Sequence, residues 1–166
     1  MFQIDTSIIV KELGRSIDLF KPETALLATF LIGILADLIF RKTKNIVGYI
    51  AIVGFLVSSF FLFNQNVDPQ PSFFAMMVVD PFSILFKQIV VLSSVAIIVF
   101  SFFSKELQDS KHNLGEYYVF ILGMAFGMFL LCGATNLVMI YLAIETMSIS
   151  SYILTGYTKE VQRSSE

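Results

Sequence analysis

The chain has 166 residues, of which 56% are hydrophobic and only 14% are charged, with a net charge of −2. This composition leaves too little polar surface for a water-soluble domain and predicts an integral membrane protein. The small net charge without a basic block argues against a nucleic-acid partner, and the single cysteine, Cys132, excludes an internal disulfide.

The N-terminal segment, residues 1–22, mixes charged residues with short apolar clusters and lacks the pattern of a cleaved signal peptide. Its apolar residues at positions 9, 13, 17 and 20 share one helical face, which predicts a short helix lying in the membrane interface. Residues 23–157 are predicted to form a transmembrane helix bundle, and residues 158–166 a polar cytoplasmic tail.

Five long apolar runs make up the predicted bundle, each near the roughly 20 residues that a helix needs to cross hydrocarbon. None of them alternates strictly between apolar and polar residues, so helices are favoured over a barrel and the fold class is all-α, polytopic. The spans are predicted at about 24–40, 46–63, 79–103, 115–132 and 136–157. Residues 64–72, which include two prolines, are predicted to form a loop.

The basic residues predict the orientation in the membrane. The loops after the first and third spans and the tail carry lysine and arginine, whereas the loop after the second span and the turn after the fourth carry none. We therefore expect the basic loops and the C-terminus to face the cytoplasm and the N-terminus to lie outside, although Lys11, Arg15 and Lys21 count mildly against this.

Glu145 lies near the middle of the last span, where a carboxylate is costly. At 1.5 Å per residue it lies roughly 12 Å from the outer end of the helix, close to the bilayer midplane. The polar residues of this span share one helical face because of their 4-3-4-3 spacing: Tyr141, Glu145, Ser148, Tyr152 and Thr155. A carboxyl group that changes its charge with its surroundings suits a proton relay, whereas a protonated acid could simply bond a neighbouring helix.

Lys87 is the second ionisable residue deep inside a span. It lies two turns after Asp80 on nearly the same face, and Ser94 and Ser101 continue that face at intervals of seven. A buried ammonium is costly unless it is paired or hydrated, but a lysine stem can also carry its charge toward the membrane surface. The sequence leaves both a second relay and an anchor open for Lys87.

Other polar or reactive residues have simpler explanations. Asp37 precedes Arg41 by one turn, which predicts an ion pair at a helix end, and Glu116 lies at a helix N-terminus, where the dipole favours an acid. His112 is expected to be a solvated loop residue and Cys132 a packing residue. The G-x-x-x-G step of Gly123 and Gly127 predicts a close contact between helices. No phosphate-binding loop, catalytic triad or dinucleotide motif occurs in the sequence, so no cofactor or metal site is expected on this chain.

Two stretches carry a family resemblance. VDPFSILFKQIV at 79–90 and GEYYVFILGMAFGMFLLCGATNLVMIYLAIETMSISSYILTGY at 115–157 resemble subunit N of bacterial NADH-quinone oxidoreductase, respiratory complex I, the counterpart of mitochondrial NADH dehydrogenase subunit 2. The E-Y-Y start, the L-x-x-E-T-M-S step and the closing S-Y-I-L-T-G-Y are distinctive together. The resemblance is strong over the second half of the chain and looser over the first span.

The resemblance implies an antiporter-like subunit of a membrane arm, built from inverted repeats with broken helices. Glu145 falls on the family's fifth-helix glutamate, which is proposed to pair with a lysine on a later helix and to couple quinone reduction elsewhere in the complex to proton transfer. NADH, flavin, iron–sulfur clusters and quinone are expected on other subunits, so this chain would belong to a translocase without catalysing redox chemistry itself. The implied setting is the bacterial inner (cell) membrane, with the lipid bilayer and other membrane-arm subunits as partners.

Full-length members of this family have about fourteen helices, and their lysine-bearing helices have no counterpart in these 166 residues. The chain thus resembles the N-terminal third of such a subunit, and the remaining C-terminal helices are expected as a further partner. Two alternatives stay open from the residues alone: a subunit of a multi-subunit cation/proton antiporter, and a non-transporting helical membrane scaffold.

Overall fold

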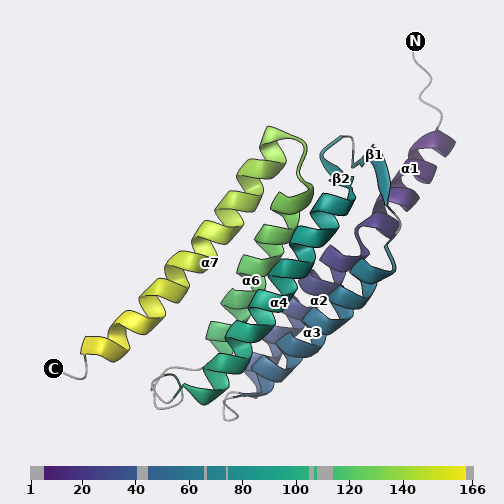
Figure 1. The fold of residues 1–166 in the computed structure, drawn as a ribbon. Coiled ribbons are helices and arrows are strands. Elements are labelled where there is room, and N and C mark those ends of the chain that lie inside the picture. The colour runs from purple at the N-terminus through teal and green to yellow at the C-terminus, as the bar shows by residue number, and fades with distance from the viewer. Residues whose placement is uncertain are drawn as a thin grey trace.

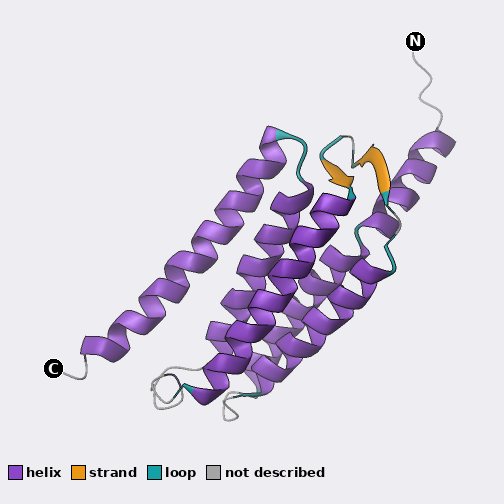
Figure 2. Ribbon diagram, viewed as in Figure 1, coloured by secondary structure: helices purple, strands orange, loops and turns teal. Residues whose placement is uncertain are grey.

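The computed structural model describes residues 6–40, 45–65, 67–73, 75–104, 107 and 114–163. In that part of the chain the fold consists of six helices and one small hairpin (Figures 1 and 2). Five of the helices are long and apolar enough to cross a membrane, which confirms the predicted all-α, polytopic fold. The elements are α1 (Thr6–Leu19), α2 (Lys21–Ile39), α3 (Ile46–Phe63), β1 (Asp68–Ser72), β2 (Met77–Val79), α4 (Pro81–Phe103), α6 (Leu114–Gly133) and α7 (Leu137–Arg163).

Helices α2, α3, α4 and α6 form the packed part of the bundle, and α7 lies at its edge against α6 (Figure 1). Helix α6 is the most buried span because it contacts α2, α3, α4 and α7. Its inward side chains meet those of the other helices in one apolar core, whose fully buried members include Leu26, Phe55, Ile98, Tyr118 and Phe129. Each span therefore has a side that packs on α6 or its neighbours and a side that faces outward.

The two ends of the bundle differ in what they carry (Figure 1). The start of α2, the hairpin, the start of α4 and the α6–α7 turn lie at one end, which we call the hairpin end. The C-terminus of α7 lies at the opposite end, where α2 and α4 finish and α3 and α6 begin. The chain thus alternates direction from span to span (Figure 1).

The helix boundaries follow local capping signals. Helix α3 spans residues 46–63, as predicted, whereas α4 begins at Pro81, two residues after its expected start, because Asp80 caps it. Proline at the first helical position suits a helix start, since its missing N–H would have no partner there. Helix α7 continues to Arg163, so residues 158–163, which we expected in the polar tail, are helical.

The segment that the sequence predicts as a loop over residues 64–72 instead contributes a strand. Strand β1 pairs antiparallel with β2, with Asp68 opposite Val79 and Ser72 opposite Met77. The prolines of β1 are tolerated because each strand of a two-stranded ribbon has a free edge. The hairpin is held to the α6–α7 turn by Thr135, whose N–H donates to Met76 O at 3.0 Å and whose hydroxyl donates to Ala75 O at 2.9 Å.

Helix α1 forms where the sequence predicts a short amphipathic helix. Two residues of its apolar face, Leu13 and Ile17, are exposed, and the buried Ser16 accepts a hydrogen bond from the N–H of Phe73 beside the hairpin. The rings of Phe20 and Phe73 meet edge to face at a centroid distance of 5.2 Å. The position of this helix in the membrane interface stays a prediction.

Glycines set the closest helix contacts, as the G-x-x-x-G step predicts. A Cβ atom on Gly127 would lie 2.7 Å from Met147 Cγ and 3.0 Å from Ala143 O, so no side chain fits between α6 and α7 there. Gly123 is similarly close to Ser150, with 2.9 Å between a Cβ and the serine hydroxyl. Small residues at such steps allow helix backbones to approach each other within a membrane.

Candidate functional site

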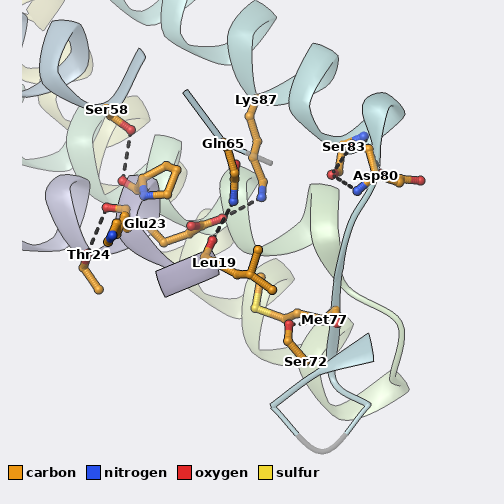
Figure 3. Close-up of polar contacts among 12 residues, drawn as sticks. Leu19, Glu23, Thr24, Ser58, Gln65, Ser72, Met77, Asp80, Ser83 and Lys87 are labelled. Carbon is orange, nitrogen blue, oxygen red and sulfur yellow. Dashed lines mark hydrogen bonds and ion pairs between the residues drawn. The ribbon is translucent and has the colours of Figure 1, made fainter. Parts of the chain in front are cut away.

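Lys87 forms an ion pair with Glu23 inside the bundle. The Nζ atom of Lys87 lies 2.6 Å from Glu23 Oε1, and the two side chains are 0% and 1% exposed. Glu23 lies in the first turn of α2 and Lys87 in the second turn of α4, so the pair joins two helices through residues that are 64 positions apart in sequence (Figure 3). Lys87 therefore holds its charge against a buried carboxylate of another helix. Whether it serves as a relay or as an anchor stays a prediction.

A capping box fixes the start of α4 and with it the position of Lys87. Ser83 N–H donates to Asp80 Oδ1 at 2.7 Å, and Asp80 N–H donates to Ser83 Oγ at 3.2 Å. This reciprocal pair satisfies backbone donors that the first helical turn leaves without partners. Asp80, which the sequence places on nearly the same face as Lys87, thus acts as the cap, while Glu23 neutralises the lysine.

Two helix termini favour the charges of the pair. Glu23 lies at the N-terminus of α2, where the helix dipole stabilises an anion. Lys87 lies beside the last residue of α6, because a Cβ on Gly133 would be 3.6 Å from Lys87 Nζ. A helix C-terminus carries the negative end of the dipole and stabilises a cation. The backbone thus offsets part of the cost of removing both charges from water.

Polar side chains from α3 and the segment after it approach the same place. Ser58 donates to Pro22 O at 3.0 Å and so holds the start of α2, and Gln65 Nε2 donates to Leu19 O, at the end of α1, at 2.6 Å. Glu23 Oε2 and Gln65 Oε1 are buried and have no hydrogen-bond partner among the described residues. The site therefore combines one short ion pair with further buried polar atoms.

The hydroxyl row that the sequence places on α4 also faces inward. Ser94 and Ser101 are 7% and 3% exposed, and Ser101 Oγ hydrogen-bonds to the Tyr118 hydroxyl of α6 at 3.0 Å. Successive members of the row are seven residues apart, which corresponds to roughly 10 Å along a helix. Since hydrogen bonds do not span that distance, the row is a series of separate polar contacts.

Glu145 occupies a different environment. It is exposed on α7, and Tyr141 lies one turn earlier on the same exposed face. The side of α7 that packs on α6 is formed by Ala143, Met147 and Ser150, so the polar face with Glu145 points away from α6. The structure does not bring Glu145 together with Lys87.

The remaining sequence-predicted residues are structural or lie outside the described residues. The carboxylate of Asp37 contacts Gly115 at the start of α6, where the helix dipole favours an anion, and Arg41, its expected partner, lies outside the described residues. Glu116 is exposed in the first turn of α6 and Cys132 is half-buried. His112 lies outside the described residues, and within them no three histidine, cysteine or acidic residues gather as a metal site.

The sequence analysis did not predict the pairing of Glu23 with Lys87. The sequence holds a weak signal for the pair, since a lysine deep in one span requires an acid from another. Several acids near the span ends could have met that need, and only the packing of α2 against α6 and α4 against α6 selects Glu23.

Known relatives match most or all of the chain and extend well beyond it. The chain is 37% identical, over its full length, to NADH-quinone oxidoreductase subunit N 2 of Chloroherpeton thalassium, of which it covers 34%. It is 36% identical over 91% of its length to the chloroplastic NAD(P)H-quinone oxidoreductase subunit 2 of Mesostigma viride, covering 30% of that protein. It is also 39% identical over 87% of its length to subunit 2 of Nostoc punctiforme, covering 27%. No family model matches the chain.

Proposed function

Because the chain belongs to the family of NADH-quinone oxidoreductase subunit N, whose members it matches over about a third of their length, we propose that it is a proton-translocating part of a membrane arm. The five apolar spans suit such an arm. Oxidation of NADH and reduction of quinone would take place on other subunits, and this chain would supply ionisable groups within the membrane.

The observation that carries this proposal is the position of Glu145. It lies about eight residues into α7, on a polar face that no other described helix covers. A carboxyl group facing lipid is costly, so such a face calls for protein or water beside it. We infer that further helices of the same subunit cover this face and supply a cation near Glu145. Proton uptake and release by Glu145 would then depend on whether that cation is close.

The proposed setting is a bacterial inner membrane. The hairpin end, where α2 begins, would face outward, and the opposite end, where α7 finishes, would face the cytoplasm (Figure 1). The partners would be the other subunits of the membrane arm and the bilayer. This orientation can be tested by attaching a reporter enzyme to each terminus.

The substitution Glu145→Gln in the assembled complex tests the proposed relay. We expect NADH-driven proton uptake into membrane vesicles to fall roughly tenfold or more, because positioned acid–base groups typically contribute a hundredfold or more to rate. Assembly should persist, since Gln has nearly the same size and the site is exposed on this chain. Glu116→Gln, at the exposed start of α6, is the matched control and should leave proton uptake unchanged.

Copurification tests the assignment to the enzyme independently. Recovery of this chain with an NADH-oxidising module supports the proposal, whereas recovery with other transporter chains alone would replace it by a cation/proton antiporter. If Glu145→Gln retains the wild-type proton-to-electron ratio and turnover, the chain is a scaffold rather than a translocating element.

A further inference from the structure

The Glu23–Lys87 ion pair has more hydrogen-bonding capacity than the described residues use. The ammonium of Lys87 carries three donors, and the structure gives it one partner, Glu23 Oε1. Glu23 Oε2 and Gln65 Oε1 are acceptors without a partner among the described residues. They belong to one cluster, because Gln65 donates to Leu19 O, one helical turn before Glu23, and Glu23 contacts Lys87 (Figure 3).

This combination of groups is suited to water. Buried polar atoms are nearly always hydrogen-bonded, and an internal water molecule requires two to four polar partners. The cluster offers a carboxylate oxygen, an amide oxygen and ammonium donors, so it can bond both the hydrogens and the oxygen of a water molecule. An apolar filling of the same space would leave each of these groups at full desolvation cost.

We propose that Glu23, Lys87 and Gln65 form a hydrated proton-exchange site at the hairpin end of the bundle, with Glu23 as the group that takes up and releases the proton. The role of this site in translocation rests on the proposed function, whereas its hydration and titration do not. It is separate from Glu145, which lies on the exposed face of α7.

The two carboxylate oxygens of Glu23 have different tasks in this site. Oε1 stays bonded to Lys87, which remains an ammonium beside the C-terminus of α6. A proton arrives at Oε2 from a hydronium ion: one O–H bond of the hydronium breaks, an O–H bond forms on Oε2, and a water molecule is left. Release reverses these steps, so the pair alternates between zero and one positive charge.

The surroundings limit how that proton can reach the site. On the hairpin side, Val78 O and Met77 Cε lie within 3.1 and 3.2 Å of where a Cβ on Gly133 would be, next to Lys87 Nζ. The unpartnered acceptors, Glu23 Oε2 and Gln65 Oε1, are where we place the water, so exchange should depend on the Gln65 amide. This distinguishes the site from a permanent ion pair, for which Gln65 would serve only to hold Leu19 O.

Infrared difference spectroscopy tests titration without assuming any pumping activity. The chain is purified from its membrane together with the chains that accompany it, and spectra are recorded as the pH is lowered in H2O and in D2O. We expect a protonated-carboxyl band that shifts in D2O, is lost in Glu23→Gln and persists in Glu116→Gln. A carboxyl difference spectrum that is the same in Glu23→Gln as in wild type overturns the proposal.

A second measurement covers the case in which Glu23→Gln does not assemble. A high-resolution map of the wild-type complex should show ordered water within hydrogen-bonding distance of Glu23 Oε2, and Gln65→Leu should lose both that water and the D2O-sensitive band. If the wild-type map shows only carbon atoms around Oε2, the site is dry and the proposal is wrong.

Vesicle assays then separate this proposal from the proposed function. The double variant Glu23→Leu with Lys87→Met replaces both charges by apolar groups, which for buried ion pairs is often neutral for folding. Assembly with a lowered proton-to-electron ratio supports a role for the site in translocation. Wild-type pumping in the double variant while Glu145→Gln abolishes pumping limits the pair to a structural role. A Glu23 band with unaltered pumping in Glu145→Gln instead sinks the proposed relay and leaves the exchange site standing.

Discussion

Removing one member of the Glu23–Lys87 pair should destabilise the fold in a way that depends on pH. Lys87→Met leaves a carboxylate that is 1% exposed without its cation. The carboxylate can escape by taking up a proton, and at pH 7 protonating an ordinary glutamate side chain costs about 4 kcal/mol. That value limits the penalty for the unpaired carboxylate and lies within the roughly 3–5 kcal/mol known for breaking buried ion pairs.

The reciprocal substitution Glu23→Leu leaves the Lys87 ammonium without its anion. Deprotonating an ordinary lysine at pH 7 costs about 5 kcal/mol. The two variants should respond to pH with opposite signs. In Lys87→Met the folded state holds a proton that the unfolded state releases, so the loss shrinks to about 1 kcal/mol at pH 5. In Glu23→Leu the unfolded state takes up a proton that the folded state lacks, so the loss shrinks to about 2 kcal/mol at pH 9.

Unfolding by sodium dodecyl sulfate in mixed micelles, followed by circular dichroism at pH 5, 7 and 9, measures these differences against wild type. The double variant Glu23→Leu with Lys87→Met is the control. It should unfold within about 1 kcal/mol of wild type and show neither pH slope, since no charge is left unpaired. Slopes of the same sign in both single variants, or additive losses in the double variant, would refute the assigned pairing.

Three further predictions concern the frame around the site and use the same unfolding assay. Gly127→Ala should lower the free energy of unfolding by about 1–3 kcal/mol, because its Cβ would lie 3.0 Å from backbone atoms of α7. Gly156→Ala, whose Cβ would have no atom within 4 Å, should raise it by about 0.5–1 kcal/mol. Equal effects of the two substitutions would contradict the α6–α7 contact. Asp80→Ala should cost about 1 kcal/mol through loss of the α4 cap, and a neutral result would argue against the capping box. Tyr118→Phe should cost about 1 kcal/mol, and its effect should vanish in a Ser101→Ala background unless the two hydroxyls are independent.

The parts of the fold that follow from hydrophobic runs could be predicted from the sequence. Residues 46–63 form one helix as expected, because eighteen apolar or small residues without a breaker have no better way to satisfy their backbone in a membrane. The contact of α6 with α7 at Gly123 and Gly127 could also be predicted, because small residues four positions apart mark a helix interface. The sequence also identified Lys87 and Glu145 as the ionisable residues deep in the spans.

The features that the sequence missed depend on contacts between distant segments. Strand β1 carries two prolines and has no strand-like alternation, so its sequence does not predict that it pairs with β2. The hairpin is held by a contact with a distant segment, the hydrogen bond from Thr135 of the α6–α7 turn to Met76 O. The Glu23–Lys87 pair joins two helices through residues that are 64 positions apart. Propensity and periodicity describe one helix at a time, and neither shows which acid lies opposite a given lysine.

The Glu23–Lys87 pair and Glu145 differ in how many of their charged partners these helices supply. At Glu23 and Lys87 the helices supply both charges, two favourable helix termini and a polar amide, so the pair is neutral and enclosed. At Glu145 they supply one acid, a nearby tyrosine on the same face and an outward orientation. Because an unpaired charge against lipid is costly, α7 has the strongest electrostatic reason of the five spans to bind further protein. If the proposed function holds, a cation brought to Glu145 by that protein would act on a face of α7 that the structure does not bring together with the Glu23–Lys87 pair, so we expect substitutions at the two sites to have independent effects on proton uptake.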